Sequence, residues 1–488
     1  MHPLTRRARR LAAAALAALV AAPLVAPAQA EPSAPPSLRL FATRDDVELV
    51  RYRGRVYLQL GVWATPVGGD FDLRAQRPDF GRPVVVSQLD PATGDVVRTL
   101  PSDAASSLRG LDDFVVVTLR DDGGEVVAEK SFWMCPNADR QRVDGEGRDV
   151  SRFPEFCDDG SVFFKGNRWG IDDHWAIDVM EAGPSWTPRM RAPAGDFEAT
   201  VRIADRYADA LGVAPEDATV TLQVTVRDYR DRGAPQAAAE AADGGGETPV
   251  PHAGVPTVEE PPAGTAPDLV ALPAWRLQVG RDDGRDHLGF ASTLWNDGPA
   301  PLVVEGYRRA GEDVMDAFQY FYDASGEPVA RTPAGTIEFD HRRGHHHWHM
   351  TQFVEYSLVD ALTGDVVRSK KQSFCLVPTD PIDLSVPGAE FYPWNDGRRS
   401  RCGGFDALWI REHIPAGWGD TYYQRVAGQA FDVTNLPNGW YRARIEVNPT
   451  GVLHERTTDN NVDERLLYLK GEPGSRRVRV APWKGLDI

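Results

Sequence analysis

The strongest constraint on the fold of this chain is an alternation of side chains that begins at residue 345 and continues to residue 358. Successive side chains of a β-strand point to opposite faces, so His345, His347 and His349 are predicted to share one face. His346 has the other parity and is interpreted as packing or solvent-facing. That other parity also holds the large apolar residues Trp348, Met350, Val354, Tyr356 and Leu358. The segment is therefore predicted to be a half-buried strand with a core face and an imidazole face.

Three imidazoles on one strand face indicate a metal site. Neutral imidazole nitrogen suits copper, zinc, iron or nickel, and three protein ligands leave positions open for water or substrate. An affinity tag and a His-rich low-complexity tract are the simpler alternatives. Both fit less well, because five of the eleven histidines lie together inside a folded pattern: His341, His345, His346, His347 and His349.

The first thirty residues are predicted to be a secretory signal peptide. Four arginines between residues 6 and 10 precede an apolar run from Leu11 to Val25 and a small-residue motif, Ala28-Gln29-Ala30. The apolar run is short for a membrane span, and no later segment is apolar enough to be one. We therefore expect a chain that starts near Glu31, has no transmembrane segment and is secreted, extracellular or in the cell envelope. The twin-arginine route stays open.

Export sets the redox context of the four cysteines. Disulfides persist outside the cytosol, and the pairs Cys135 with Cys157 and Cys375 with Cys402 would each close a modest loop. The formal net charge of −17 argues against a nucleic-acid partner, since phosphates would be repelled.

Composition divides the chain into two similar segments. Residues 232–266 contain Ala, Gly, Pro and Glu without a large apolar period, which is typical of a disordered linker. On either side, at 31–231 and 267–488, short Val, Ile, Phe and Tyr runs alternate with turn residues. The prediction is an all-β protein with two tandem β-sandwich-like domains joined by that linker.

The two predicted domains also share a motif order. Residues 114–119, 123–127 and 131–132 near Cys135 parallel residues 353–358, 363–367 and 373–374 before Cys375. This indicates a diverged duplication, although chance similarity between sandwiches is the alternative. Where the second segment has its histidines, the first has residues 109–112, Arg-Gly-Leu-Asp, so only the C-terminal domain can build the metal site.

Four motifs in order identify a family. Residues 345–353, 371–376, 420–422 and 447–462 together resemble the catalytic domain of the lysyl oxidases over most of 267–469. The resemblance implies a copper(II) amine oxidase whose cofactor, lysine tyrosylquinone, forms from the protein's own side chains. It implies His345, His347 and His349 as copper ligands, with Lys371 and Tyr422 as the cofactor and catalytic residues.

The same resemblance implies a reaction. Copper near a phenol lowers the phenol pKa, and the quinone that forms is an electrophile for amines. A primary amine, from peptidyl lysine or a small molecule, would be deaminated to an aldehyde with molecular oxygen as acceptor, releasing hydrogen peroxide and ammonia. Apart from molecular oxygen, the expected partners of the enzyme are these amine substrates.

Some assignments stay open. Lys370 replaces Lys371 if the strand register slips by one, and Tyr423 is the less favoured neighbour of Tyr422. The gap of 51 positions (422 − 371) exceeds that expected for animal members, so an insertion around 380–401 is predicted near the site, where it is expected to reshape substrate access.

A calcium site is a further expectation from the resemblance. Its matching residues are Asp268, Glu455, Asn460 and Asn461, while Thr457 stands at a carboxylate position for which Asp459 is a substitute. A plain turn at 459–461 explains the late residues equally well.

Two functions compete with amine oxidation. One is a non-catalytic copper-binding cell-envelope protein that never matures a quinone. The other is an adhesive double sandwich with a structural zinc ion, against which the positions of Lys371 and Tyr422 argue.

Overall fold

The structure is a computed structural model that describes residues 34–138, 140–144, 146–148, 150–180, 188–228, 254–309, 312–340, 347–393, 398, 400, 402–404, 407–424 and 428–488. In these ranges the chain forms β-strands and one short helix, α1 (Asp205–Leu211), which confirms the all-β prediction. The predicted signal peptide and residues 232–253 of the predicted linker lie outside the described residues. No helix in the described part is long and apolar enough to cross a membrane.

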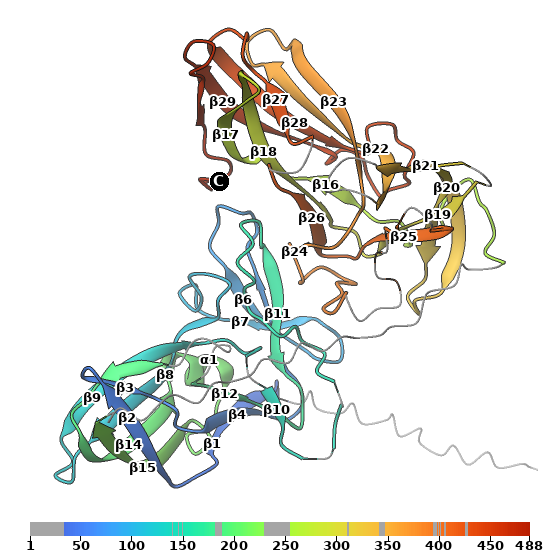
Figure 1. Cartoon of the computed structure of the whole chain (residues 1–488). Coiled ribbons are helices and arrows are strands. Elements are labelled where there is room, and N and C mark those ends of the chain that lie inside the picture. Colours follow the sequence, from blue (N-terminus) through green and yellow to red (C-terminus); the bar gives the residue numbers. More distant parts are fainter. Residues whose placement is uncertain are drawn as a thin grey trace, which may run out of the picture. The chain divides into compact units, whose positions relative to one another are not determined.

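The N-terminal half contains three sheets (Figure 1). The first has the order β1 (Ser37–Ala42), β4 (Val62–Val67), β12 (Trp175–Asp178), β10 (Arg140–Arg142). The second has the order β11 (Gly166–Ile171), β5 (Phe71–Gln76), β6 (Val85–Leu89), β7 (Val96–Thr99). The third has the order β13 (Arg189–Arg191), β3 (Arg55–Tyr57), β2 (Asp46–Tyr52), β15 (Thr219–Asp228), β14 (Gly195–Ile203), β8 (Leu111–Arg120), β9 (Val126–Met134).

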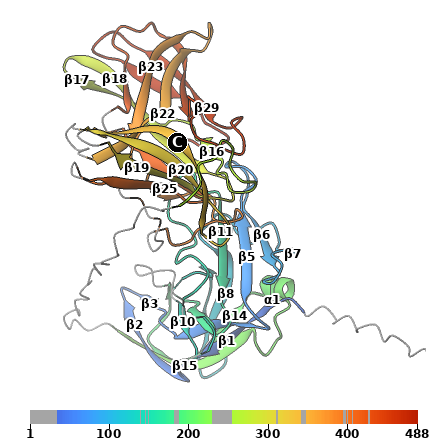
Figure 2. The same cartoon turned by 90° about the vertical axis from the view of Figure 1, so that its right-hand side faces the viewer.

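The C-terminal half contains two sheets, whose strands hold His347, His349, Lys370, Lys371 and Tyr422. The smaller is β16 (Leu269–Ala271), β18 (Arg285–Asn296), β26 (Trp418–Tyr422), β24 (Asp380–Pro381), with β17 (Trp275–Asp282) and β27 (Ala430–Asp432) also paired to β18. The larger is β25 (Trp409–Ile414), β19 (Leu302–Arg308), β20 (Val314–Tyr322), β21 (Pro328–Asp340), β22 (His347–Asp360), β28 (Gly439–Val447), β29 (Val462–Lys470), β30 (Arg477–Val480), with β23 (Val366–Phe374) paired to β22. Figure 2 shows β22 and β23 from the side.

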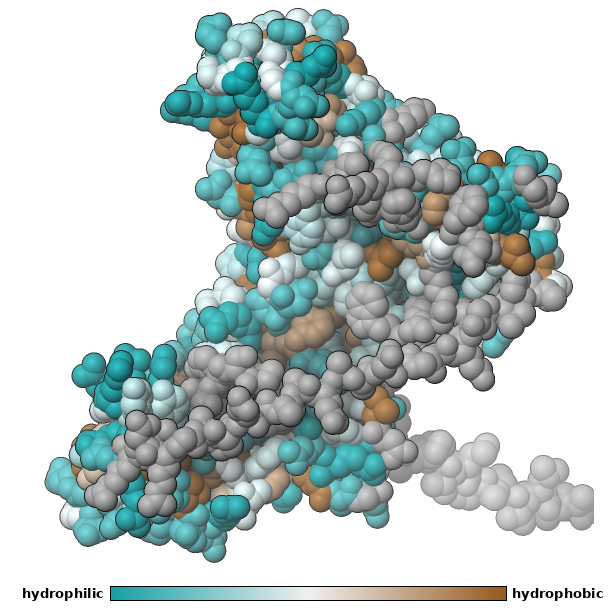
Figure 3. Space-filling model, viewed as in Figure 1, coloured by the Kyte–Doolittle hydropathy of each residue, from teal (hydrophilic) through white to brown (hydrophobic). Residues whose placement is uncertain are grey.

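One apolar core joins the two C-terminal sheets. The predicted apolar set of β22 is confirmed, since Trp348, Met350, Val354, Tyr356 and Leu358 are all buried in this core. Burying large aliphatic and aromatic side chains stabilises the fold by roughly 1.5–3 kcal/mol per side chain. The face of the molecule in Figure 3 is largely hydrophilic, with hydrophobic side chains in small separate groups. Most large apolar side chains of the described part of the chain are buried in the core.

Both predicted disulfides are confirmed. Cys135 bonds to Cys157 and Cys375 bonds to Cys402. Each joins the end of a strand, β9 or β23, to the segment that follows it. The second bond bears on the candidate site described below.

The predicted insertion contacts strand β11 of the N-terminal half over part of its length. Lys165 N–H donates to the Ile382 carbonyl and Leu384 N–H donates to the Gly166 carbonyl. The Tyr392 hydroxyl donates to the Phe153 carbonyl at 2.6 Å. This part of the insertion is thus held by backbone pairing within the protein.

Candidate metal and cofactor site

Two of the three predicted metal ligands lie together at the start of β22. Strand β21 pairs with this segment, placing Asp340 opposite His347 and Glu338 opposite His349. The two imidazole ring centroids are 4.6 Å apart. His345 lies outside the described residues, as do His341 and His346. The shared strand face predicted for His347 and His349 is therefore present, and the three-histidine set stays a prediction.

The imidazole face is less open than the half-buried strand prediction implies. Only 2% of His349 is exposed, and its Nδ1 lies 3.5 Å from Asp340 Oδ2. The reason is the position of β22 in the sheet, where β21 covers one edge and its Asp340 side chain packs against the ring. Within the described ranges no group of three or more His, Cys, Asp or Glu side chains could hold a metal ion.

Tyr422 ends strand β26 and lies against the end of β23. Its backbone pairs with Ser292 of β18, which fixes the direction of its side chain. The hydroxyl donates to the Cys375 carbonyl at 2.7 Å, and the ring centroid is 4.0 Å from that of Phe374. Tyr422 is thus a partly buried phenol held at both its ring and its hydroxyl.

A chain of contacts connects Tyr422 to the histidine strand. Cys375, whose carbonyl accepts the Tyr422 hydroxyl, is bonded to Cys402. The Cys402 carbonyl accepts the N–H of Trp348 at 3.0 Å, between His347 and His349 in sequence. The disulfide therefore ties the predicted quinone tyrosine to the predicted copper strand through two hydrogen bonds.

The two candidate lysines lie on β23 before this contact. Lys371 stands opposite Glu355 and Lys370 opposite Tyr356 in the ladder. A strand rises about 3.3 Å per residue, so the Lys371 backbone is about 10 Å along the strand from Phe374, which contacts Tyr422. The side chain of Lys371 lies outside the described residues. The predicted link between Lys371 and Tyr422 has to span this offset.

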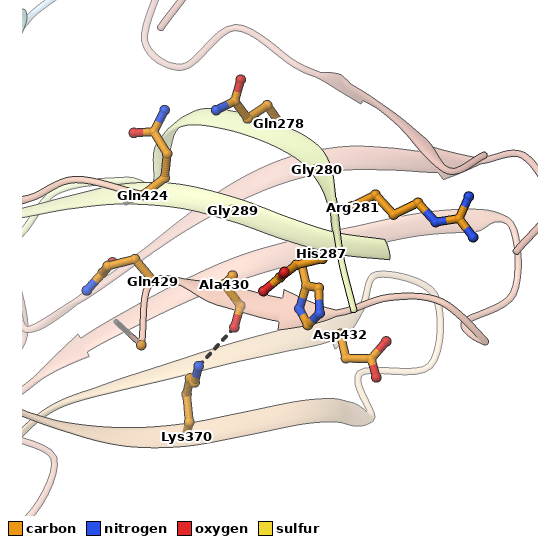
Figure 4. A pocket seen from close by; sticks show the side chains of 12 residues that line it. Gln278, Gly280, Arg281, His287, Gly289, Lys370, Gln424, Gln429, Ala430 and Asp432 are labelled. Atoms are coloured by element: carbon orange, nitrogen blue, oxygen red, sulfur yellow. Dashed lines mark hydrogen bonds between the residues drawn. The ribbon is translucent and has the colours of Figure 1, made fainter. Parts of the chain in front are cut away.

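Lys370 has a different role in the structure. Its ammonium donates to the Ala430 carbonyl at 2.9 Å and lines an open cavity of about 630 Å³ (Figure 4). His287, Asp432 and Gln429 line the same cavity. The volume is in the range of small-molecule sites, although the lining has more polar groups than such sites usually have.

A buried hydrogen-bonded group separates this cavity from Tyr422. The Gln429 amide donates to the Tyr356 hydroxyl at 2.9 Å, and that hydroxyl lies 2.5 Å from Ser292 Oγ. Tyr356 is fully buried and burial raises its pKa above the ordinary tyrosine value. These three uncharged, hydrogen-bonded side chains therefore lie between the cavity and the rings of Phe374 and Tyr422.

Two carboxyl groups near Tyr422 received no role from the sequence: Asp420 belongs to the 420–422 motif without an assigned function, and Glu412 belongs to no motif. Glu412 of β25 is fully buried and Asp420 of β26 is 2% exposed. Burial raises the pKa of each well above its usual range. Burial and then the charges of Asp420 and Glu412 raise the pKa of Tyr422 well above 10. Isolated acidic residues in strands are usually exposed, so only the fold could place these two beside a phenol.

The predicted calcium residues are close together. The Asn460 amide donates to Asp268 Oδ1 at 3.0 Å, and the Asn461 amide donates to Glu455 Oε1 at 2.9 Å. The amide oxygens Asn460 Oδ1 and Asn461 Oδ1 are buried and accept no hydrogen bond within the described part of the chain. Buried oxygen acceptors of this kind suit a hard cation, while Arg456 lies 3.7 Å from Asp268 and competes for that carboxylate.

Comparison with known families identifies the class of the C-terminal part. Residues 318–476 match the family model described as lysyl oxidase. They include β22, β23 and β26, on which His347, His349, Lys371 and Tyr422 lie. The chain therefore contains a lysyl oxidase family domain in its C-terminal half.

Individual relatives are distant and much longer. Lysyl oxidase homolog 4 of Mus musculus is 28% identical over 138 residues, which cover 28% of this chain and 16% of that protein. Lysyl oxidase homolog 2 of Gallus gallus is 26% identical over 212 residues, which cover 41% of this chain and 24% of that protein. This chain thus matches a quarter or less of each relative's length.

The solved structures add no argument about the fold. An alpha-2-macroglobulin from Salmonella aligns over 90% of this chain and 24% of its own at 10% identity, with a TM-score of 0.12. One from Escherichia coli aligns over 90% and 26% at 8% identity, with a TM-score of 0.10.

Proposed function

We propose that the C-terminal half is a copper-dependent amine oxidase that deaminates primary amines and carries lysine tyrosylquinone. The family match of residues 318–476 supports an amine oxidase of the lysyl oxidase class. The observation that carries the proposal is the connection from Tyr422 through Cys375 and Cys402 to the backbone of Trp348. It joins two motifs that are more than seventy residues apart in the sequence.

The described imidazoles fit a shared metal ion. Two imidazoles that bind one ion at about 2 Å per nitrogen have ring centroids about 4–5 Å apart, and those of His347 and His349 are 4.6 Å apart. Asp340 beside His349 is the kind of carboxylate that orients a ligating imidazole through its other nitrogen. His345, His347 and His349 would hold copper(II), which when bound supplies a positive charge and oxygen chemistry.

The residues around Tyr422 determine whether its phenol can ionise. Burial, Asp420 and Glu412 all oppose ionisation of the phenol. Neither carboxyl forms an ion pair with a described Lys or Arg side chain. A phenol in these surroundings stays protonated until a cation or a proton acceptor changes the balance. This requirement is consistent with a copper site close by.

The remaining assignments belong to the same proposal. Residues 1–30 serve as a signal peptide for secretion or the cell envelope, 31–231 as a partner domain, 232–266 as a linker and 267–488 as the copper domain. Lys371 contributes the cofactor amine, and calcium binds near Asp268, Glu455, Asn460 and Asn461. The substrates are peptidyl lysine or small primary amines, with molecular oxygen as acceptor.

A direct test uses the full chain loaded with copper in air. We expect peroxide release with a small primary amine and a positive redox stain for a protein-bound quinone. Tyr422→Phe should abolish both, whereas Tyr423→Phe should retain both, because Tyr423 is 40% exposed and adjacent. Activity that survives in Tyr422→Phe would remove the quinone from the account.

A non-catalytic copper-binding protein is the second candidate. The offset of about 10 Å between the Lys371 backbone and the Phe374 contact favours it, since the Lys371 amine has to cross this distance to reach the Tyr422 ring. Copper that binds in stoichiometric amount without any stain or change in intact mass would decide for this candidate.

A further inference from the structure

Asp420 is a buried carboxyl group to which neither the 420–422 motif nor the proposed metal site assigns a role. It lies on strand β26 two residues before Tyr422, so both side chains leave the same face of the strand. It is 2% exposed, and its hydrogen bonds to the backbone are long, at 3.4 Å from Val377 N. Asp420 and the Tyr422 hydroxyl both bond to the same short segment, since the hydroxyl donates to the Cys375 carbonyl and the N–H of Val377 donates to Asp420.

No cation compensates this carboxyl group among the described side chains. The groups that face it are Thr379 and Asp380 from the β24 segment, Glu412 from β25, Tyr356 from β22 and Tyr422 from its own strand. All of the titratable ones are acids. A buried carboxylate without a positive neighbour is costly, so Asp420 binds a proton more tightly than an exposed aspartate does and its ionised form is the stronger base. Burial raises the pKa of Asp420 well above its usual range for this reason.

We propose that Asp420 is the proton acceptor for the phenol of Tyr422. This step uses the ionised form of Asp420: the O–H bond of Tyr422 breaks and an O–H bond forms on the Asp420 carboxylate, with no electron transferred. The phenol must lose this proton before its ring is oxidised, so the inference rests on the proposed function and deepens it. Glu412 is the nearby second carboxyl whose charge tunes the pair.

Geometry distinguishes Asp420 from the other candidates. Tyr422 donates its proton to the Cys375 carbonyl at 2.7 Å, but a carbonyl oxygen cannot keep a proton at neutral pH. The Tyr356 hydroxyl is a weak base that is occupied by Gln429 and Ser292. Among these groups of the described chain, Asp420 combines a bond to the same 375–377 segment as the hydroxyl, a shared strand face and a basic oxygen.

The first experiment needs no cofactor. A group with a raised folded-state pKa stabilises the fold below its unfolded pKa and loses that contribution as pH rises through the folded value. We expect the melting temperature of the metal-free full chain to fall less between about pH 5 and about pH 8 in Asp420→Asn than in the wild type. Asp365→Asn, on an exposed turn, is the matched control and should follow the wild type. Identical pH profiles for the wild type and Asp420→Asn would overturn the premise that the fold raises the proton affinity of Asp420.

The second experiment follows quinone formation after copper is added in air. We expect Asp420→Asn to bind copper normally and to form the stained quinone about 10²-fold more slowly, as removal of a proton-transfer group predicts. Raising the pH should restore much of the rate in Asp420→Asn, because hydroxide replaces the missing acceptor, and Asp420→Glu should restore part of it. A role in packing alone would show neither form of rescue.

The outcomes separate this inference from the proposed function. A wild type that binds copper and forms no quinone overturns both. A wild type that forms the quinone, together with Asp420→Asn that forms it at the same rate and the same pH dependence, overturns only the role of Asp420.

Discussion

The segments Leu111–Met134 and Met350–Phe374 form the same pair of strands in the two halves of the protein. The ladder of β8 with β9 shifts register between Leu111 and Val115, and that of β22 with β23 shifts between Met350 and Val354. These positions are 239 residues apart (354 − 115). Asp113 and Gln352, also 239 apart, both have a positive φ, of 47° and 53°.

The difference between the two segments lies at the start of the first strand. Strand β8 begins at Leu111, whereas β22 begins three positions earlier in the corresponding frame, at His347. Gly110 corresponds to His349, has φ 146°, and a Cβ there would lie 2.2 Å from the Met134 carbonyl oxygen. The two strand pairs share the same bulge, but only β22 extends three residues further at its start, and this extension carries His347 and His349. The proposed duplication draws support from this parallel.

The largest expected effect comes from removing an imidazole at that edge. His349→Ala should reduce copper content and lower amine-dependent peroxide release by roughly 10³-fold or more, the scale of losing an essential catalytic group. His174→Ala in the N-terminal half is the control and should leave both unchanged. Copper content by elemental analysis of purified protein makes the comparison. Full copper binding by His349→Ala would contradict the proposal that the start of β22 binds the metal and the start of β8 does not.

A histidine placed in the other half should fail for steric reasons. Gly110→His should lower the free energy of unfolding by about 4 kcal/mol or more, since the new side chain meets backbone and the φ value is strained. Gly124→Ala, which also has a positive φ but nothing within 4 Å of its Cβ, should cost only about 1 kcal/mol. Denaturant unfolding measures both. A stable Gly110→His protein that binds copper would contradict the account.

Removing either disulfide should lower the stability of the protein by a similar amount, but only one removal should slow quinone formation. The bonds close loops of 22 and 27 residues, so removing either pair should cost roughly 3 kcal/mol. Only Cys375→Ser with Cys402→Ser should also slow quinone formation, because that bond connects Tyr422 to the histidine strand. Equal rates of quinone staining in the two double variants would show that this connection has no functional role.

The smallest effect is expected at the matched turns after β8 and β22. Asp121 Oδ1 accepts the N–H groups of Gly123 and Glu125, and Asp360 Oδ1 accepts those of Leu362 and Thr363. The substitutions Asp121→Asn and Asp360→Asn should each lower the melting temperature slightly and leave copper binding unchanged. A change in copper content in either variant would refute this expectation.

The pH dependence at Asp360 has a definite sign. Backbone N–H groups of Thr363 and Leu362 lower the pKa of Asp360 below its usual value. The stabilisation is therefore present above the unfolded pKa of about 3.9 and is lost as pH falls through the folded value. The difference in melting temperature between the wild type and Asp360→Asn should shrink on acidification. A difference that grows in acid would contradict the assignment.

Side-chain periodicity was sufficient to predict much of the fold. The apolar parity of β22 and the pairing of all four cysteines follow from local pattern and compartment, and the structure confirms both. Periodicity could not predict that His349 would be 2% exposed, because its burial depends on Asp340 of a neighbouring strand. The sequence assigned a face to the histidine but not what covers that face.

The sequence predicted only those residues of the site that lie in recognisable motifs. The motifs located Tyr422, and the fold placed its hydroxyl on the Cys375 carbonyl. Glu412 and Asp420 belong to different strands, and no spacing in the sequence indicates that both approach one phenol. The insertion after residue 380 was expected near the site. Its described contacts with β11 come from backbone pairing, which composition does not encode.

Peptide mass spectrometry of the full chain after copper loading in air tests the central claim most directly. The account predicts one crosslinked species that joins the peptide of Lys371 to the peptide of Tyr422, absent when copper is withheld and absent in His347→Ala. Two linear, unmodified peptides from copper-saturated, oxygen-exposed protein would contradict it.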